Sequence, residues 1–190
     1  MRQDPAGALP VAHPLLVARL PRNRATAFDL TPDADALATL TGLLGVSHLR
    51  KLRFVGKVGP LEGAQAGRGG FGLSGRLSAT VVQPCSVTLV PVTTRIAEEV
   101  VRRYLPDLTL PDAAEAELPE DVDAEPLPEV IDPAAVMVEA LALAVPTCPR
   151  APDADLGEAT FAPPGVAPLR AQDMRPLAGL AALRDRLRDK

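Results

Sequence analysis

The chain has 190 residues, enough for one domain that buries about 70% of its unfolded surface but too few for a second independent core. Hydrophobic residues make up 47% of the chain, but only 3% of residues are aromatic and tryptophan is absent, so leucine, valine and alanine must form the core and few rings remain for stacking on bases. The formal net charge of −4 conceals a basic first half and an acidic middle, so no single charge class describes the chain.

Two short apolar runs come first along the chain. Residues 14–20 predict one extended strand that ends at Pro21, and residues 25–30 predict a second one after a polar turn. Thr31 then predicts a helix N-cap, with Pro32 at the first helical position. The predicted helix has about three turns, and Gly45 suits its left-handed C-terminal cap. Its apolar face consists of Leu37, Leu40 and Leu44.

Alternating patterns follow the helix. Residues 47–58 predict a strand whose apolar face alternates with a face that carries Lys51, Arg53 and Lys57. Residues 63–72 predict a glycine-rich turn, and residues 73–82 predict a second long strand that Pro84 terminates. Residues 85–92 predict a further strand because they are rich in β-branched side chains.

The stretch 94–105 fits two structures. Ile96, Val100 and Tyr104 have the spacing of a helical stripe, whereas the β-branched content and the neighbouring strands suit a strand. Residues 106–132 then contain ten acidic side chains, five prolines and no basic residue. Such a composition buries too little apolar area to offset its ordering entropy, so we expect a mobile acidic loop.

The last third of the chain predicts two helices. Asp132 and Pro133 begin the first, which is apolar nearly all round until Pro146 and is therefore expected to be central. Residues 147–175 are proline-rich and predict an irregular segment, and residues 177–188 predict a short amphipathic helix.

The charge pattern is the main functional signal. Residues 1–103 carry 13 basic and 7 acidic side chains, whereas residues 104–149 carry 11 acidic side chains and no basic one. A basic half suits a polyanionic partner and an acidic segment suits a basic protein, although the pattern alone favours two solvated surfaces. The candidate RNA-contact residues are Arg50, Lys51, Arg53, Lys57, Arg68 and Arg76, with Arg95, Arg102 and Arg103 in their possible neighbourhood. The candidate protein-contact residues are Glu115, Glu117, Glu120, Asp121, Asp123 and Glu125.

No motif of the chain predicts catalysis, a cofactor or a metal. Residues 67–72 match the glycine pattern of dinucleotide-binding loops, but no helix pattern or spaced acid follows, so a turn between strands is the better interpretation. Cys85, Cys148, His13 and His48 lack the short spacings of zinc ligands and of a disulfide framework. Reduced thiols, the lack of an apolar N-terminal signal and the lack of a membrane-length apolar run predict a cytoplasmic protein with no membrane contact.

Three segments resemble a known family in their order along the chain. Residues 73–92, Leu-Ser-Gly-Arg-Leu-Ser-Ala-Thr-Val-Val-Gln-Pro-Cys-Ser-Val-Thr-Leu-Val-Pro-Val, resemble the signature of the YceD family of large ribosomal RNA subunit accumulation proteins. After the acidic insert, residues 129–146 resemble the family's "Ile-Asp, then Glu-x-Leu-x-Leu-x-x-Pro" helix, and residues 175–184 its C-terminal helix. Many members carry Cys-x-x-Cys at the signature, whereas here Thr88 takes the second position, which counts against a metal or redox role.

The resemblance implies a non-enzymatic bacterial factor that supports accumulation of 23S ribosomal RNA and formation of the 50S subunit, often encoded next to ribosomal protein bL32. It also favours a strand over residues 94–105. The expected fold is α+β, a single domain over residues 1–190 with a mostly antiparallel, twisted or barrel-like sheet and two or three packed helices. The expected partners are 23S rRNA or pre-50S particles and a basic ribosomal protein such as bL32; a protein adaptor without RNA contact is the alternative.

Overall fold

The computed structural model describes residues 9–61, 69–106, 108, 124–155, 157, 162–163 and 165–166. The chain divides into two compact units, residues 1–152 and 153–190, and every helix and strand of the described residues lies in the first. The described residues of the second unit form short turns, in which the Gly157 N–H donates to Asp155 Oδ1 over 2.9 Å and the Val166 N–H donates to the Pro163 carbonyl over 3.1 Å. The predicted helix over residues 177–188 lies outside the described residues.

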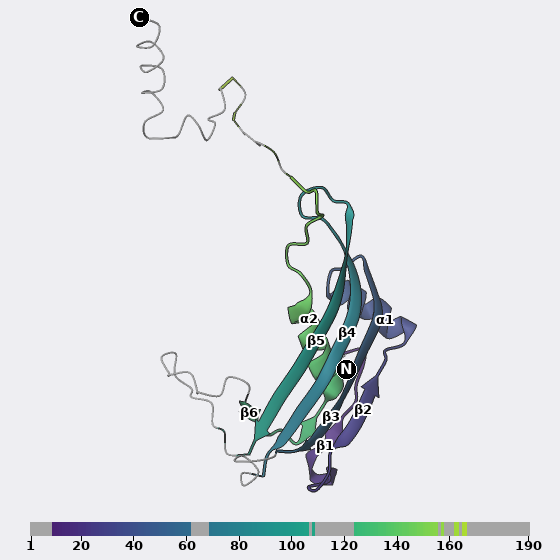
Figure 1. Cartoon of the computed structure of the whole chain (residues 1–190), viewed down its shortest axis with the longest axis vertical. Helices are drawn as coiled ribbons and strands as arrows, with labels where there is room; N and C mark the ends of the chain where they lie inside the picture. The colour runs from purple at the N-terminus through teal and green to yellow at the C-terminus, as the bar shows by residue number, and fades with distance from the viewer. Residues whose placement is uncertain are drawn as a thin grey trace, which may run out of the picture. The chain divides into compact units, whose positions relative to one another are not determined.

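An open five-stranded sheet forms the body of the first unit (Figure 1). Its strands, in spatial order, are β2 (Thr26–Leu30), β3 (His48–Pro60), β4 (Phe71–Pro84), β5 (Pro91–Leu105) and β6 (Ala124–Pro126). Neighbours pair antiparallel except β5 and β6, which are parallel. The sequence predicted a twisted or a barrel-like sheet. The sheet does not close, so it is not a barrel. The strand over residues 94–105 is confirmed as part of β5.

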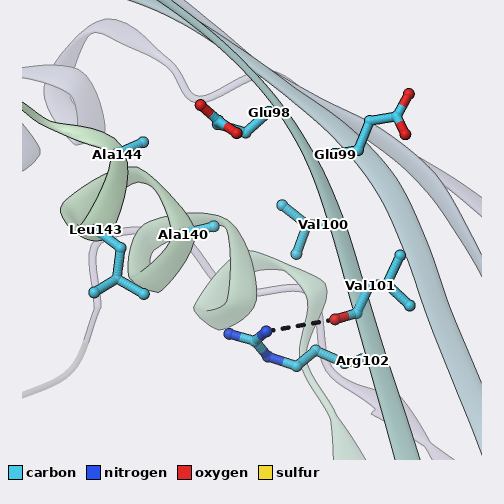
Figure 2. A pocket seen from close by; sticks show the side chains of 8 residues that line it. All are labelled: Glu98, Glu99, Val100, Val101, Arg102, Ala140, Leu143 and Ala144. Carbon is cyan, nitrogen blue, oxygen red and sulfur yellow. Dashed lines mark hydrogen bonds between the residues drawn. The ribbon is translucent and has the colours of Figure 1, made fainter. Parts of the chain in front are cut away.

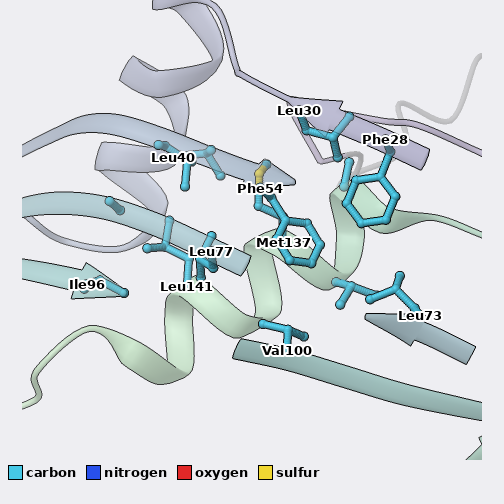
Figure 3. Close-up of a cluster of buried hydrophobic side chains, with 14 of the residues drawn as sticks. Phe28, Leu30, Leu40, Phe54, Leu73, Leu77, Ile96, Val100, Met137 and Leu141 are labelled. Atoms are coloured by element: carbon cyan, nitrogen blue, oxygen red, sulfur yellow. The ribbon is translucent and has the colours of Figure 1, made fainter. Parts of the chain in front are cut away.

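Helices α1 (Ala34–Leu43) and α2 (Pro133–Ala144) contribute to one apolar core on one face of the sheet. Leu40 of α1 and Met137 and Leu141 of α2 are completely buried there. Figure 3 shows them among side chains that project from the strands, which include Phe28, Leu30, Phe54, Leu73, Leu77, Ile96 and Val100. The alternation predicted for residues 47–58 is confirmed from Lys51 onward and is broken before it by two successive exposed residues, Arg50 and Lys51, whereas that predicted for residues 73–82 is confirmed throughout.

Both helix ends show how local sequence fixes the elements. Gly45 has a φ of +62°, and its N–H donates to the Gly42 carbonyl while the Val46 N–H donates to the Thr41 carbonyl, so the predicted left-handed cap is confirmed. The predicted N-cap of α1 was wrong. Asp33, rather than Thr31, accepts the Ala36 N–H over 2.9 Å, because its carboxylate reaches the third residue of the helix.

The predicted cap of α2 is confirmed, and its carboxylate has a second role. Asp132 Oδ1 accepts the Ala134 N–H over 2.8 Å and also the His13 N–H over 2.9 Å. Beside this contact β1 (Leu15–Leu16) pairs antiparallel with β7 (Val130–Ile131), and the short 3-10 helix η1 (Val17–Arg19) follows. The strand predicted over residues 14–20 is thus only two residues long. Its partner β7 also has only two residues, so no further strand pairing is possible.

Two predicted segments need correction. A strand was predicted for residues 85–92. Residues 85–90 instead form a turn, and strand β5 begins only at Pro91. Within the acidic loop predicted for residues 106–132, β6 and β7 are ordered strands, whereas residues 107 and 109–123 lie outside the described part. The described residues of the segment 147–175 belong to no helix or strand.

A bulge in β3 explains why the chain places Leu49 and Leu52 on the same buried face. The register between β3 and β4 shifts between Arg50 and Arg53, and Lys51 has a φ of +54°. One extra residue on β3 therefore restores the inward direction after two exposed basic side chains.

Gly56 and Gly75 are neighbours on β3 and β4, and aromatic rings lie directly against them. A Cβ at Gly56 would lie 2.3 Å from the Ser74 carbonyl oxygen and 2.7 Å from Phe28 Cζ, and one at Gly75 would lie 2.7 Å from Phe54 Cε2. The rings of Phe28 and Phe54 are themselves in contact, with centroids 5.1 Å apart. The rings of Phe28 and Phe54 can lie against the sheet here only because Gly56 and Gly75 have no side chains.

Gly56→Ala is expected to lower the free energy of unfolding by about 1–3 kcal/mol, because the new methyl group overlaps rigid backbone as well as a ring. Urea denaturation measures this change. Gly42→Ala in α1 is the matched control: its Cβ meets nothing within 4 Å, so the same substitution should stabilise the helix by about 0.5–1 kcal/mol. Equal stability of the two variants would contradict the packing argument.

Candidate nucleic-acid interface

The face of the sheet opposite the helices, here called the outer face, is solvent-exposed along strands β2 to β5. Alternate residues of each strand point to it, and valines there stay open to solvent, with Val55 40% and Val101 51% exposed. The side chains of Arg53 and Arg76 are 56% and 73% exposed on the same face. A strand that is buried on one side only must place its polar residues on the other.

The register brings basic residues from three strands together on the outer face. Lys57 lies opposite Ser74, Arg53 opposite Ser78, and Arg50 opposite Thr80, which in turn pairs with Arg95 of β5. Arg76 lies between Val55 and Glu99. Lys51 is exposed at the bulge beside these rows. The structure thus gathers five of the six predicted RNA-contact residues, and Arg68 lies outside the described residues.

Two carboxylates interrupt this basic surface. Asp29 accepts hydrogen bonds from both Arg53 Nε, over 2.9 Å, and Arg53 Nη2, and this bonding lowers the pKa of Asp29 and raises that of Arg53. Glu99 Oε1 accepts from Arg76 Nη2 over 2.9 Å. Among the described residues, no ion pair involves Arg50, Lys51, Lys57 or Arg95. These four cations therefore hold charge that the described part of the protein does not neutralise.

A shallow depression of about 450 Å³ lies in the middle of the outer face. Backbone of Gly56 and Gly75 contributes to its lining, together with Val55, Lys57 and Arg76. The described aromatic residues, Phe28, Phe54, Phe71 and Tyr104, are all buried. The described outer face therefore offers charge and shape to a ligand but no ring on which a base could stack.

The register also separates residues that the sequence places side by side. Arg103 lies opposite Gly72 and belongs to the outer-face alternation, whereas Arg102 points to the helix side of the sheet. There it pairs with Glu125 of β6 over 3.1 Å and with Glu139 of α2 over 2.9 Å. Of the six predicted protein-contact acids only Glu125 is described, and this ion pair holds it.

Cys85 begins the turn between β4 and β5 and is completely buried. Its Sγ accepts the backbone N–H groups of Val87, Thr88 and Ala151, each over 3.4 Å. The Ser86 N–H also donates to the Pro149 carbonyl over 2.8 Å, so this turn is fastened to the segment after α2. No pattern in the sequence indicates this contact, because its two partners are more than 60 residues apart and the β-branched turn has the composition of a strand.

Hydrogen bonds to the sulfur, first from the Thr88 side chain and then from the Ala151, Thr88 and Val87 backbone, lower the pKa of Cys85 to about 6, against the opposing effect of burial. Cys148 is exposed and free. Within the described residues, no three histidine, cysteine or acidic side chains converge on a common point as metal ligands would. No helix in the described part of the chain has both the length and the apolar character needed to cross a membrane.

In a Cys148→Ser background, the ultraviolet absorbance of the Cys85 thiolate is expected to titrate near pH 6 rather than near the ordinary value of 9. The pKa of Cys85 is lower in the folded than in the unfolded protein. The hydrogen-bonded thiolate therefore stabilises the folded state fully above the unfolded-state pKa, and this stabilisation disappears as the pH falls through 6. The stability difference between this protein and the same protein with Cys85→Ser should therefore grow from pH 6 to pH 9. A titration midpoint at the ordinary value would contradict the hydrogen-bonded geometry.

Comparison with known proteins agrees with the resemblance noted in the sequence. The family model described as "Large ribosomal RNA subunit accumulation protein YceD" matches residues 73–184, which include β4 from Leu73 onward and all of β5, β6, β7 and α2. Searches of curated proteins and of solved structures found no match. The family model covers more than half of the 190 residues of the chain, so the chain belongs to the YceD family of large ribosomal RNA subunit accumulation proteins.

Proposed function

We propose that this protein is a non-enzymatic cytoplasmic factor that supports accumulation of 23S rRNA and formation of the 50S subunit by binding rRNA through the outer face. The observation that carries the proposal is the set of four cations, Arg50, Lys51, Lys57 and Arg95, without an ion pair in the described part of the protein. Clustered basic side chains bind phosphates and release counterions, and this effect supplies much of the affinity for nucleic acid.

The mode of RNA contact follows from what the outer face presents. Buried aromatic rings exclude base stacking by the described residues, so recognition relies on phosphates and on the shape of the RNA. Ser74, Ser78 and Thr80 alternate with the basic residues and offer hydroxyl groups to phosphate or 2′-hydroxyl oxygens. Such a surface suits structured rRNA and gives little discrimination between base sequences.

The acidic segment is proposed as a contact for a basic ribosomal protein such as bL32. A high density of carboxylates without basic residues attracts a cationic partner through long-range electrostatics. Glu125 is already paired with Arg102, so the contact is assigned to the remaining acids. These are Glu115, Glu117, Glu120, Asp121 and Asp123.

Replacing Lys57 and Arg95 by glutamine is expected to weaken binding of a 23S rRNA fragment and to reduce the slope of log K against log salt by about 1.5, since each phosphate contact contributes roughly 0.7–0.9. Fluorescence anisotropy across a salt series measures both quantities. The control exchanges Arg19 and Arg150, which are exposed and lie outside strands β2 to β5, for glutamine. Binding that does not respond to salt, or no binding, would favour a protein adaptor without RNA contact.

Depletion of the protein in cells is expected to lower 23S rRNA and 50S particles selectively, with 16S rRNA retained. Sucrose-gradient profiles and rRNA quantification measure the effect after rescue by three forms: the natural protein, the Lys57/Arg95 double variant, and a variant with the acids of residues 115–123 changed to amides. The natural protein should restore both quantities and each variant only part of them. An unchanged profile under full depletion would reject a ribosomal role.

A further inference from the structure

Strand β5 presents an open edge over most of its length. It pairs with β4 from Pro91 to Tyr104, whereas on its other side β6 covers only Arg103 to Leu105. No other described strand pairs with this side of β5. Residues 91–102 therefore form an edge of the kind at which sheets accept a further strand.

Backbone hydrogen bonds at the two ends of β5 identify which of its groups face outward. The Cys85 N–H donates to the Val90 carbonyl across the β4–β5 register, so even-numbered residues of β5 face β4. The Leu105 carbonyl instead accepts the Leu127 N–H on the opposite side. Because the direction alternates along a strand, the N–H and C=O groups of Arg95, Ala97 and Glu99 point away from β4 and toward the open edge. Those of Val101 point the same way, but its carbonyl accepts Arg102 Nη1 over 3.4 Å (Figure 2).

A groove of about 560 Å³ runs beside this edge, between β5 and α2. Figure 2 shows Ala140, Leu143 and Ala144 on the helix side of it and residues 98–102 on the strand side. The nearly all-round apolar character of α2 predicted a central helix, and α2 does contribute Ala134, Met137 and Leu141 to the core. Leu143 is 76% exposed, so one apolar side of α2 has no cover in the described part of the protein.

The charge of the groove is negative. Glu98, Glu125 and Glu139 lie on or next to its walls, and Arg102 is the one described cation among them. Nearby, burial and then the charge of Glu125 raise the pKa of Tyr104 to about 12, with Arg102 opposing and Glu139 adding to the effect. Glu98 has no ion-pair partner among the described residues. A cationic ligand would complement this arrangement.

We propose that an extended, basic segment of a partner protein adds to the open edge of β5 as a further strand and places alternate side chains in the groove against α2. β6 is the precedent, since it already adds to the same edge in extended form. Outward backbone groups of β5 supply the hydrogen bonds, Leu143 and its neighbours receive apolar side chains, and Glu98 attracts lysine or arginine. The inference deepens the protein-partner half of the proposed function and does not involve the outer face.

The test uses the full chain and a fluorescein-labelled peptide in which lysine and valine alternate over about twelve residues. Ala97→Pro removes one outward N–H without removing a hydrogen bond to β4, and Glu98→Lys reverses the charge of the groove. Each is expected to weaken binding about tenfold, measured by fluorescence anisotropy. Asp35→Lys in α1 changes charge by the same amount away from the groove and should leave binding unchanged.

A second probe protects the test against a misfolded variant. The same peptide with alternate amides N-methylated keeps its charge but cannot form strand hydrogen bonds, so it should bind the natural protein at least about tenfold more weakly. Equal binding of the two peptides, or full binding by Glu98→Lys, would overturn strand addition.

A second copy of the chain on the edge would also overturn the proposal. It would appear in sedimentation experiments as a dimer that Ala97→Pro dissociates. Salt-dependent rRNA binding by Ala97→Pro and Glu98→Lys separates the two proposals, because both variants should bind rRNA normally if only the edge is affected.

Discussion

The rings of Phe28 and Phe54 lie on the bare backbone of Gly56 and Gly75, and the rest of the architecture depends on this contact. It lets the bulkiest side chains of the core sit directly on the middle of the sheet, where Met137 and Leu141 of α2 join the same cluster. The largest buried side chains are thereby committed to one face. The opposite face is left to residues that water can solvate, and the charge of the sheet accumulates there.

This division gives one sheet two electrostatic characters. Basic side chains occupy the outer face, whereas carboxylates gather where β5 meets α2, and Arg102 balances part of that negative charge. The two regions share β5 but point in different directions, so a polyanion and a cationic segment could be bound at the same time without competing. The proposed contacts with rRNA and with a basic protein segment therefore use separate surfaces of the sheet.

The sequence predicts elements well where one local rule decides them. Period-two burial identifies β3 and β4, and Asp132 begins α2 at the expected residue. Ile96, Val100 and Tyr104 were ambiguous because a spacing of four residues fits one face of a helix and also one face of a strand. The turn at Cys85 was missed because its composition is that of a strand, and because the contacts that fasten it to Pro149 and Ala151 lie far away in the sequence. The pattern of β3 alone identified Lys57 as a candidate RNA-contact residue. Its neighbours on β4 and β5, and the open edge of β5, are known only from the pairing register of the strands.

The bond between His13 and Asp132 has a consequence for the order of folding. Strands β2 to β5 are a meander of sequential pairings that can assemble as each hairpin is synthesised. The N-terminal strand β1 has no such neighbour, because its partner β7 lies 114 to 116 residues later in the sequence, and closing so long a loop is costly and slow. The first part of the unit to be translated is therefore the last to find its place, and Asp132 accepts its second hydrogen bond, from the His13 backbone N–H, only when β1 reaches β7.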